Sequence, residues 1–465
     1  MAFNIFKSKK TADTVYYNGK IHAGYTFSHV VDAVAVKEGK VIAVGDFNMM
    51  EELVDTNTFL YDLKGKYVFP GFIETIERPV MDTLFKEYIH LDKDMNAEDV
   101  KDGIENVLYE YDDNEVVFGY GYGDKTFEGF NRNEITSKMD EVETSKPLLI
   151  VHDNCLTCAY NSLADKIIKE AAEEEAVRVI TLPYILNLLL PFDYETVLDE
   201  VEKVNDEYPE RGITTVYNWG SPNFFDEVFE NAVLSILNEG VLKVKHQGTL
   251  MISSKINSKL LGHLLSQLRA KCTEVSEYMM HEILYIELNE SIGENDLAEI
   301  IECAVELNIK IHISCHCDEE VAMVYKVAEK VSMRGNSEFI FIFTEEETDI
   351  SEHQKEYANS EYIRYIGKRC KSRRELFEKS KDTGEVIKQL TEIAASYLGL
   401  DELLGIIEEG FIADFSIFDR NPLEMAPAKF YKESAAMTVI NGEIVYDEAR
   451  EADDELYQML STSPL

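Results

Sequence analysis

Two short groups of cysteine and histidine carry the side chains best suited to metal or redox chemistry. Two residues separate Cys155 from Cys158, which is the spacing of a zinc knuckle or a redox pair. His312 and His316 lie at the end of a predicted strand. If both groups face one edge of a sheet, Cys155, Cys158, His312 and His316 supply a tetrahedral zinc site. The alternative is that the cysteines are small buried hydrophobes and the histidines are hydrogen-bonded core residues.

His152 and Asp153 place an imidazole beside a carboxylate at the end of another predicted strand. Adjacent residues on a strand point to opposite faces, so the two cannot act on one substrate atom without a bulge. We interpret the pair as structural and keep His152 as a pocket candidate.

The elements that would position these side chains are strands that alternate with helices. Apolar runs, each followed by an amphipathic helical pattern, occur at residues 148–151, 213–217, 241–251, 283–288, 310–314 and 339–343. Such repeats favour a closed (β/α)8 TIM-type barrel over an open doubly wound sheet. In a barrel, residues at the carboxyl ends of the strands share one mouth.

Both ends of the chain show a different pattern, in which short strands alternate with turn signals. These strands are predicted at 15–17, 33–36, 41–44, 414–418, 437–440 and 444–446. We expect the two ends to form one β-sandwich domain from residues 12–67 and 408–447, with the barrel at 68–407 and an acidic tail at 448–465.

Composition narrows the classes of partner and compartment. The chain has 88 Asp and Glu against 45 Lys and Arg, a net charge of −43, which repels nucleic acid phosphates and anionic lipids. Residues 1–10 do not resemble a secretory signal, and the apolar stretch 180–192 is too short and interrupted for a membrane span. Seven cysteines are too few for a disulfide framework. We predict a folded cytoplasmic protein without nucleic acid or membrane partners.

Several segments resemble one enzyme superfamily. Residues 62–73, which end in Pro70-Gly71-Phe72-Ile73, are similar to the barrel entry of the amidohydrolase superfamily. Residues 408–414 and 438–446 resemble its closing segment, in which the chain returns to the β-domain. Within the superfamily, stretches 119–122, 139–140, 148–162 and 211–216 resemble amidohydrolase family 3, which includes N-substituted formamide deformylases. The resemblance implies a metal-dependent hydrolase of non-peptide carbon–nitrogen bonds and a homodimer.

The residues that would hold the metal in such an enzyme are replaced. Ile76 and Arg78 occupy the positions of the family's His-x-His pair, Tyr285 that of its bridging lysine, and Ser314 that of a later histidine. Isoleucine has no lone pair, and arginine remains a cation. The segment that supplies the family's catalytic aspartate is missing before Glu385. The resemblance therefore implies a member that has lost its metal site and its general base.

Two functions remain open at this point. The first is a non-catalytic binding or regulatory relative without a cofactor, in which Arg78 binds a carboxylate. The pocket candidates are Glu77, Arg78, His152, Trp219, Tyr285 and His312. The alternative for Arg78 is an internal ion pair that fills the space of the lost metals. The second function is an active hydrolase that uses the rebuilt zinc site of Cys155, Cys158, His312 and His316.

Overall fold

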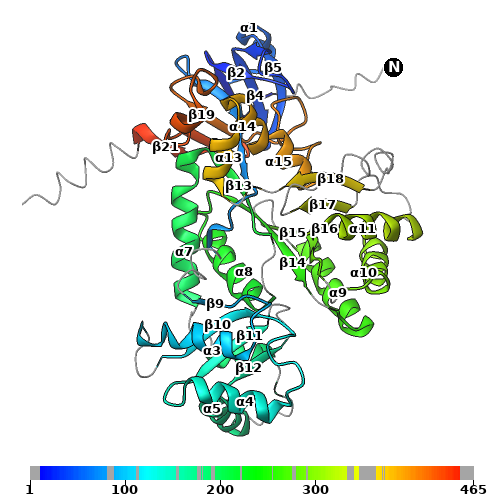
Figure 1. The fold of residues 1–465 in the computed structure, drawn as a ribbon. Coiled ribbons are helices and arrows are strands. Elements are labelled where there is room, and N and C mark those ends of the chain that lie inside the picture. Colours follow the sequence, from blue (N-terminus) through cyan, green and yellow to red (C-terminus); the bar gives the residue numbers. More distant parts are fainter. Residues whose placement is uncertain are drawn as a thin grey trace, which may run out of the picture.

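The computed structural model describes residues 11–80, 88–110, 115–152, 157–174, 180, 182–189, 194–219, 223–253, 255–274, 279–289, 292–331, 340–344, 363–368, 370 and 372–450. Figure 1 shows the strands from the two chain ends together at one end of the molecule. A small sheet from residues 89–160 lies at the opposite end, and a larger parallel sheet lies between them. The predicted acidic tail lies outside the described residues from 451 onward.

The strands from the two chain ends form two sheets that share a core. The first has the order β5-β4-β1-β6 and is made of β1 (Thr14–Tyr17), β4 (Ala33–Lys37), β5 (Lys40–Gly45) and β6 (Phe59–Asp62). The second has the order β21-β20-β19-β7-β2-β3 and is made of β2 (Lys20–His22), β3 (Val30–Val31), β7 (Tyr67–Pro70), β19 (Phe415–Phe418), β20 (Met437–Ile440) and β21 (Glu443–Asp447). Tyr16 and Val34 of the first sheet and Val68 and Phe415 of the second belong to one buried cluster. Strands from both ends of the chain thus lie in one sheet, in which β19 pairs with β7.

The predicted turn at Asn441-Gly442 connects β20 and β21. Both residues have positive φ, 51° and 77°, which is the geometry of a tight hairpin turn. A side chain at Gly442 would also meet Val36 of the first sheet at 2.5 Å. This turn therefore fits only a glycine at its second position.

The central sheet is parallel throughout and has the order β18-β17-β16-β15-β14-β13-β8. Its strands are β8 (Phe72–Glu74), β13 (Ile213–Tyr217), β14 (Lys245–Ile252), β15 (Met279–Glu287), β16 (Lys310–Cys315), β17 (Ile340–Thr344) and β18 (Ile363–Lys368). The intervening helices are α8 (Asn223–Asn238), α9 (Ser258–Glu274), α10 (Glu294–Glu306) and α11 (Asp318–Lys330). The predicted strand-then-helix order is confirmed here, and within the described residues the sheet has seven strands and two edges.

Alternation along each strand separates the two faces of this sheet. Leu284, Ile286 and Ile311 pack against α9, α10 and α11 on one face. Ile283 and Tyr217 pack on the other face against Ala394 and Ala395 of α15 (Glu392–Tyr397). The carboxyl ends of the strands beyond this second core form the edge that is called the mouth below.

The small sheet differs from the prediction for residues 148–151. Its order is β12-β11-β10-β9, from β9 (Ile89–His90), β10 (Val117–Tyr122), β11 (Leu148–His152) and β12 (Cys158–Tyr160). Helices α3 (Ala97–Glu105), α4 (Arg132–Val142) and α5 (Ser162–Glu174) accompany it. The run at 148–151 was expected to be a barrel strand, but it pairs with β10 and, antiparallel, with β12. The strand that follows β11 in the chain is therefore β12 of the same small sheet and not a strand of the central sheet.

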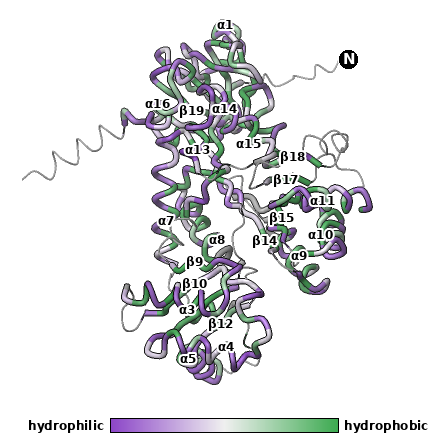
Figure 2. The backbone as a smooth tube through the Cα atoms, viewed as in Figure 1, coloured by the Kyte–Doolittle hydropathy of each residue, from purple (hydrophilic) through white to green (hydrophobic). Residues whose placement is uncertain are grey.

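The remaining helices connect these parts. They are α1 (Phe47–Met50), α6 (Leu182–Leu189), α7 (Tyr194–Glu207), α13 (Arg373–Lys379), α14 (Thr383–Leu390) and α16 (Pro427–Phe430), with short 3-10 turns at Glu51–Leu53, Leu108–Glu110, Pro209–Arg211 and Pro422–Glu424. Helix α7 buries Val197, Val201 and Val204 on one side, and Figure 2 shows hydrophilic and hydrophobic residues alternating along it. No helix among the described residues is long and apolar enough to cross a membrane.

The parts made from the chain ends and from the middle of the chain are joined by buried polar contacts. Ser416 on β19 accepts a hydrogen bond from the Phe72 amide at 3.1 Å and donates to the Gly212 carbonyl at 2.6 Å. Lys245 of β14 forms an ion pair with Asp414. Gly71 lies in this junction, because a Cβ there would come within 2.4 Å of the Thr214 hydroxyl. The Pro-Gly-Phe motif thus marks a place where only a glycine backbone fits.

Candidate functional site

Two of the predicted ligand positions follow β8. Ile76 is partly buried and packs against the largest hydrophobic cluster. The guanidinium of Arg78 lies 4.5 Å from the ring centroid of Trp219, which follows β13. An alkyl group and a cation stacked on an indole offer no lone pair to a metal ion.

The other two predicted ligand positions lie on neighbouring strands. Tyr285 on β15 is buried, and its hydroxyl donates to Glu287 Oε2 at 3.0 Å. Ser314 on β16 is also buried and pairs with Glu287 across the two strands. Because the hydroxyl of Tyr285 donates its hydrogen bond to a carboxylate, it is not positioned to bridge two metal ions.

Five side chains form a continuous row of contacts along the mouth, from β8 to β16. Arg78 stacks on Trp219, whose ring centroid is 5.9 Å from that of Tyr285. Tyr285 donates to Glu287, and Glu287 Oε1 lies 2.8 Å from His316 Nε2. We call Arg78, Trp219, Tyr285, Glu287 and His316 the mouth row. The row combines a fixed cation, an aromatic wall and a carboxylate held between a hydroxyl and an imidazole.

The electrostatics at the β16 end of the row are set by Glu320, in the first turn of α11. Its Oε2 accepts the His316 amide at 2.6 Å. Burial raises the pKa of Glu320 above its ordinary value, although this hydrogen bond and the charge of His316 act in the opposite direction. Lys93, which follows β9, also lowers the Glu320 pKa. The small sheet therefore contributes charge to the mouth.

Glu77 and His312 point to other partners. Glu77 Oε1 accepts the amide of Arg373 at 3.2 Å, at the start of α13. The buried acid beside Arg373 is Glu74, whose Oε2 lies 3.8 Å from the guanidinium and whose pKa is raised by burial. His312 is fully buried and its Nδ1 is hydrogen-bonded to the hydroxyl of Tyr217. His312 is therefore enclosed in the core, beside its register partner Tyr285 on the neighbouring strand.

The four residues of the predicted zinc alternative are distributed over different parts of the molecule. Cys155 lies outside the described residues. Cys158 is on β12 of the small sheet, His312 is in the central core, and His316 contacts Glu287. Across the described part of the chain, no three His, Cys, Asp or Glu side chains form a group that could hold a metal ion. Neither the family's metal centre nor this replacement fits the donors that the described residues place together.

His152 lies on the small sheet rather than at the mouth. Its Nε2 is 3.2 Å from Asp124 Oδ1, and its ring packs at an edge against Tyr122 at 4.9 Å. Sequence reasoning did not name Asp124, Glu287 or Glu320. Glu287 could have been predicted from the sequence, because it lies two residues beyond Tyr285 on the same strand and therefore shares its face.

Comparison with known proteins agrees with this architecture. Residues 369–446 match the amidohydrolase family. The putative amidohydrolase YtcJ of Bacillus subtilis is 37% identical over 65 residues, which is 14% of this chain and 12% of that protein. Protein LONG AFTER FAR-RED 3 of Arabidopsis thaliana is 25% identical over 160 residues, 34% of this chain and 26% of that protein. The chain thus aligns with about a quarter or less of the length of these relatives.

Solved structures extend the likeness of fold over most of the chain. A metal-dependent hydrolase of Pyrococcus horikoshii has a TM-score of 0.55 and 15% identity, covering 89% of this chain and 99% of that one. An adenosine deaminase from Xanthomonas campestris with bound zinc has a TM-score of 0.52 and 11% identity, covering 97% and 98%. At these identities the likeness concerns the fold: a mixed α/β architecture with a curled parallel sheet.

Proposed function

We propose that this protein is a degenerate relative of the formamide deformylase branch of amidohydrolase family 3, which binds a small carboxylate at the mouth instead of hydrolysing a carbon–nitrogen bond with metal. The observation that carries the proposal is the placement of Arg78, which stacks on Trp219 at the edge where the family holds its metals. In this proposal the curled sheet is the remnant of the (β/α)8 barrel, and the sheets of the chain ends are its β-sandwich.

The mouth row supplies the parts that carboxylate recognition needs. Arginine presents several N–H donors in a plane that matches the two oxygens of a carboxylate. Stacking on Trp219 holds that plane in one orientation, which lowers the entropy lost on binding. Glu287 and Glu320 at the far end favour a ligand that also carries a donor or a positive charge.

Elemental analysis and fluorescence test this proposal together. Trp219 is the chain's one tryptophan, so its emission reports on ligands at the mouth. We expect protein purified without chelators to contain far less than one zinc per chain. We also expect small carboxylates to change the Trp219 emission of the wild type. Their affinity for Arg78→Gln, measured by the same change, should be at least tenfold weaker. One equivalent of zinc together with an amidase activity that Cys158→Ala or His316→Ala abolishes would refute the proposal.

A second candidate function is that of a metal-independent hydrolase, and it is supported by the contacts among Tyr285, Glu287 and His316. The carboxylate of Glu287 contacts both the imidazole of His316 and the hydroxyl of Tyr285. An imidazole that is oriented by a carboxylate can transfer protons in general acid–base catalysis. Turnover of an amide by metal-free protein, lost in His316→Gln and kept in Arg78→Gln, would favour this candidate over ligand binding.

A further inference from the structure

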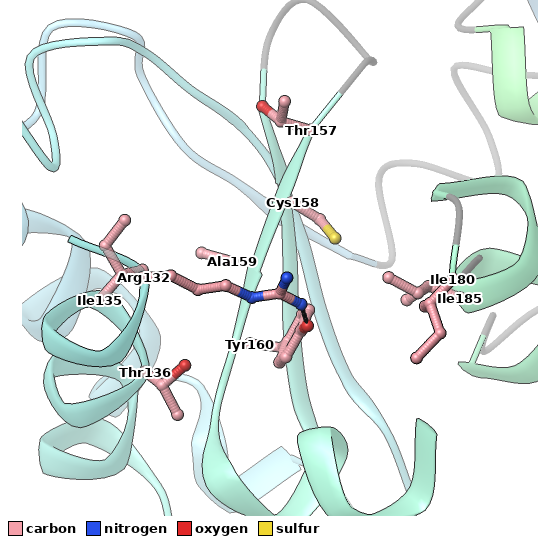
Figure 3. A pocket seen from close by; sticks show the side chains of 9 residues that line it. All are labelled: Arg132, Ile135, Thr136, Thr157, Cys158, Ala159, Tyr160, Ile180 and Ile185. Carbon is pink, nitrogen blue, oxygen red and sulfur yellow. Dashed lines mark hydrogen bonds between the residues drawn. The ribbon is translucent and has the colours of Figure 1, made fainter. Parts of the chain in front are cut away.

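A separate pocket of about 300 Å³ lies at the small sheet, between α4, β12 and the region of α6. Figure 3 shows Arg132 reaching from α4 past Ala159 to Tyr160, with Ile180 and Ile185 on the opposite side. Ile135 and Cys158 complete much of the remaining wall. The pocket thus has one cationic end and a largely apolar body, and it shares no residue with the mouth row.

Arg132 has no carboxylate partner within ion-pair distance among the residues that the structure describes. Its guanidinium donates to the Tyr160 hydroxyl and lies 5.4 Å from that ring's centroid. The nearest acid in sequence, Glu134, is occupied, because its Oε2 accepts the Asn131 amide at 2.7 Å in a capping box. An arginine without an acid among the described residues is notable in a chain with 88 Asp and Glu against 45 Lys and Arg.

The other polar atoms in the pocket do not compete for an anion. Tyr160 is buried, and since its oxygen already accepts from Arg132, its own proton is available to donate. Burial raises the pKa of the Cys158 thiol to about 12, so the sulfur stays neutral at physiological pH. The hydroxyls of Thr136 and Thr157 can donate as well. The cationic end therefore presents donors and no negative charge.

We propose that this pocket binds a small organic acid, with its carboxylate on Arg132 and Tyr160 and its apolar body against Ile135, Ile180 and Ile185. A carboxylate matches the two converging donors, since one oxygen accepts from the guanidinium and the other from the hydroxyl. The three isoleucines bury apolar surface of the ligand but cannot replace this charge-assisted recognition. The site accordingly discriminates an acid from a neutral molecule of the same shape.

Ligand-observed fluorine NMR on the full-length chain tests the proposal with 4-fluorobenzoate and its neutral match, 4-fluorobenzamide. At about 0.15 M salt, which screens the overall negative charge, we expect the benzoate to bind at least tenfold more tightly than the benzamide. Arg132→Gln is expected to remove this preference, and Tyr160→Phe to weaken benzoate binding while the ring is kept. Because the mouth row is itself proposed to bind carboxylates, these variants are compared in an Arg78→Gln background. The control is Lys138→Gln, which removes a cation from α4 outside the pocket and is expected to leave this preference intact.

The variants separate this site from the mouth. Loss of benzoate binding in Arg78→Gln with no change in Arg132→Gln would overturn the proposal and assign the acid to the mouth. Equal affinity for benzoate and benzamide, or no benzoate binding up to about 10 mM, would also overturn it. Arg132 is exposed and begins α4, so Arg132→Gln is expected to fold, which circular dichroism checks.

Discussion

Replacing Lys245 by methionine tests whether the buried ion pair couples the central sheet to the strands of the chain ends. Lys245 Nζ lies 2.8 and 3.0 Å from the two oxygens of Asp414, and both side chains are 2% exposed. Methionine keeps most of the side-chain volume but leaves the Asp414 carboxylate buried without a counter-charge. Its remaining hydrogen bond is from the Asn441 amide at 2.9 Å.

Lys243→Met provides a matched control two residues away. Lys243 Nζ is also 2.8 Å from a carboxylate, that of Asp206, but these side chains are 32% and 66% exposed. Breaking a buried pair by removing one partner costs about 3–5 kcal/mol of unfolding free energy, whereas an exposed pair contributes about 0–1 kcal/mol. The double variant Lys245→Met with Asp414→Asn should lose less than Lys245→Met alone, because the buried charge is gone and an acceptor for Asn441 remains.

Urea unfolding followed by Trp219 fluorescence measures this difference near the affected strand, since Trp219 follows β13 and β13 pairs with β14. Far-UV circular dichroism in parallel shows whether the whole chain unfolds in the same transition. The reasoning is refuted if Lys245→Met shifts the transition no more than Lys243→Met, or if the double variant is the least stable of the three.

Three further predictions concern other parts of the molecule. Burial raises the pKa of Glu74, so its contribution to stability is present in mild acid and is lost as the pH rises through the raised pKa. In unfolding titrations, Glu74→Gln should therefore match the wild type near pH 4 and become more stable than the wild type toward neutral pH. The exposed control Glu378→Gln should not show this change. Asn161→Ala should cost at least about 3 kcal/mol in chemical denaturation, because the fully buried amide donates to the Glu143 and Lys146 carbonyls and accepts from the Leu148 and Ala164 amides. A loss no larger than that of Ser162→Ala, whose exposed side chain bonds to Asp140, would contradict this. Arg78→Gln should change the emission of Trp219 without ligand, because the guanidinium over the ring is removed; an unchanged spectrum would mean that the stack does not persist in solution.

Local patterns predicted the parts of the fold that depend on local chemistry. Alternating residues and the turn at Asn441-Gly442 located the strands of the chain ends, because the hairpin geometry is encoded in those two residues. The 3.6-residue period likewise located α10 and α11. The sheet to which a strand belongs is not local information, and β11 was therefore assigned to the barrel although it pairs with β10 and β12.

The candidate site was predicted in part for the same reason. Arg78, Trp219 and Tyr285 were named together, and the structure places them in contact. Cys158 was expected beside His312 because Cys158 follows one predicted barrel strand and His312 lies at the end of another. In the structure, Cys158 instead begins the antiparallel strand β12. The pocket around Arg132 had no sequence signal, because it depends on how α4 packs beside β12.

The pairing of the two chain ends has a consequence for synthesis on the ribosome. The Tyr16 hydroxyl donates to the carbonyl of Gly442, 426 residues later, and β7 pairs with β19. At about 5–20 residues per second, strands β2, β3 and β7 wait roughly 20–80 s for β19 to be translated. Sheet β5-β4-β1-β6 needs no later residue and can form at once, but its inner face stays uncovered during this interval. The nascent chain therefore exposes one half of this core to solvent until β19 has been translated.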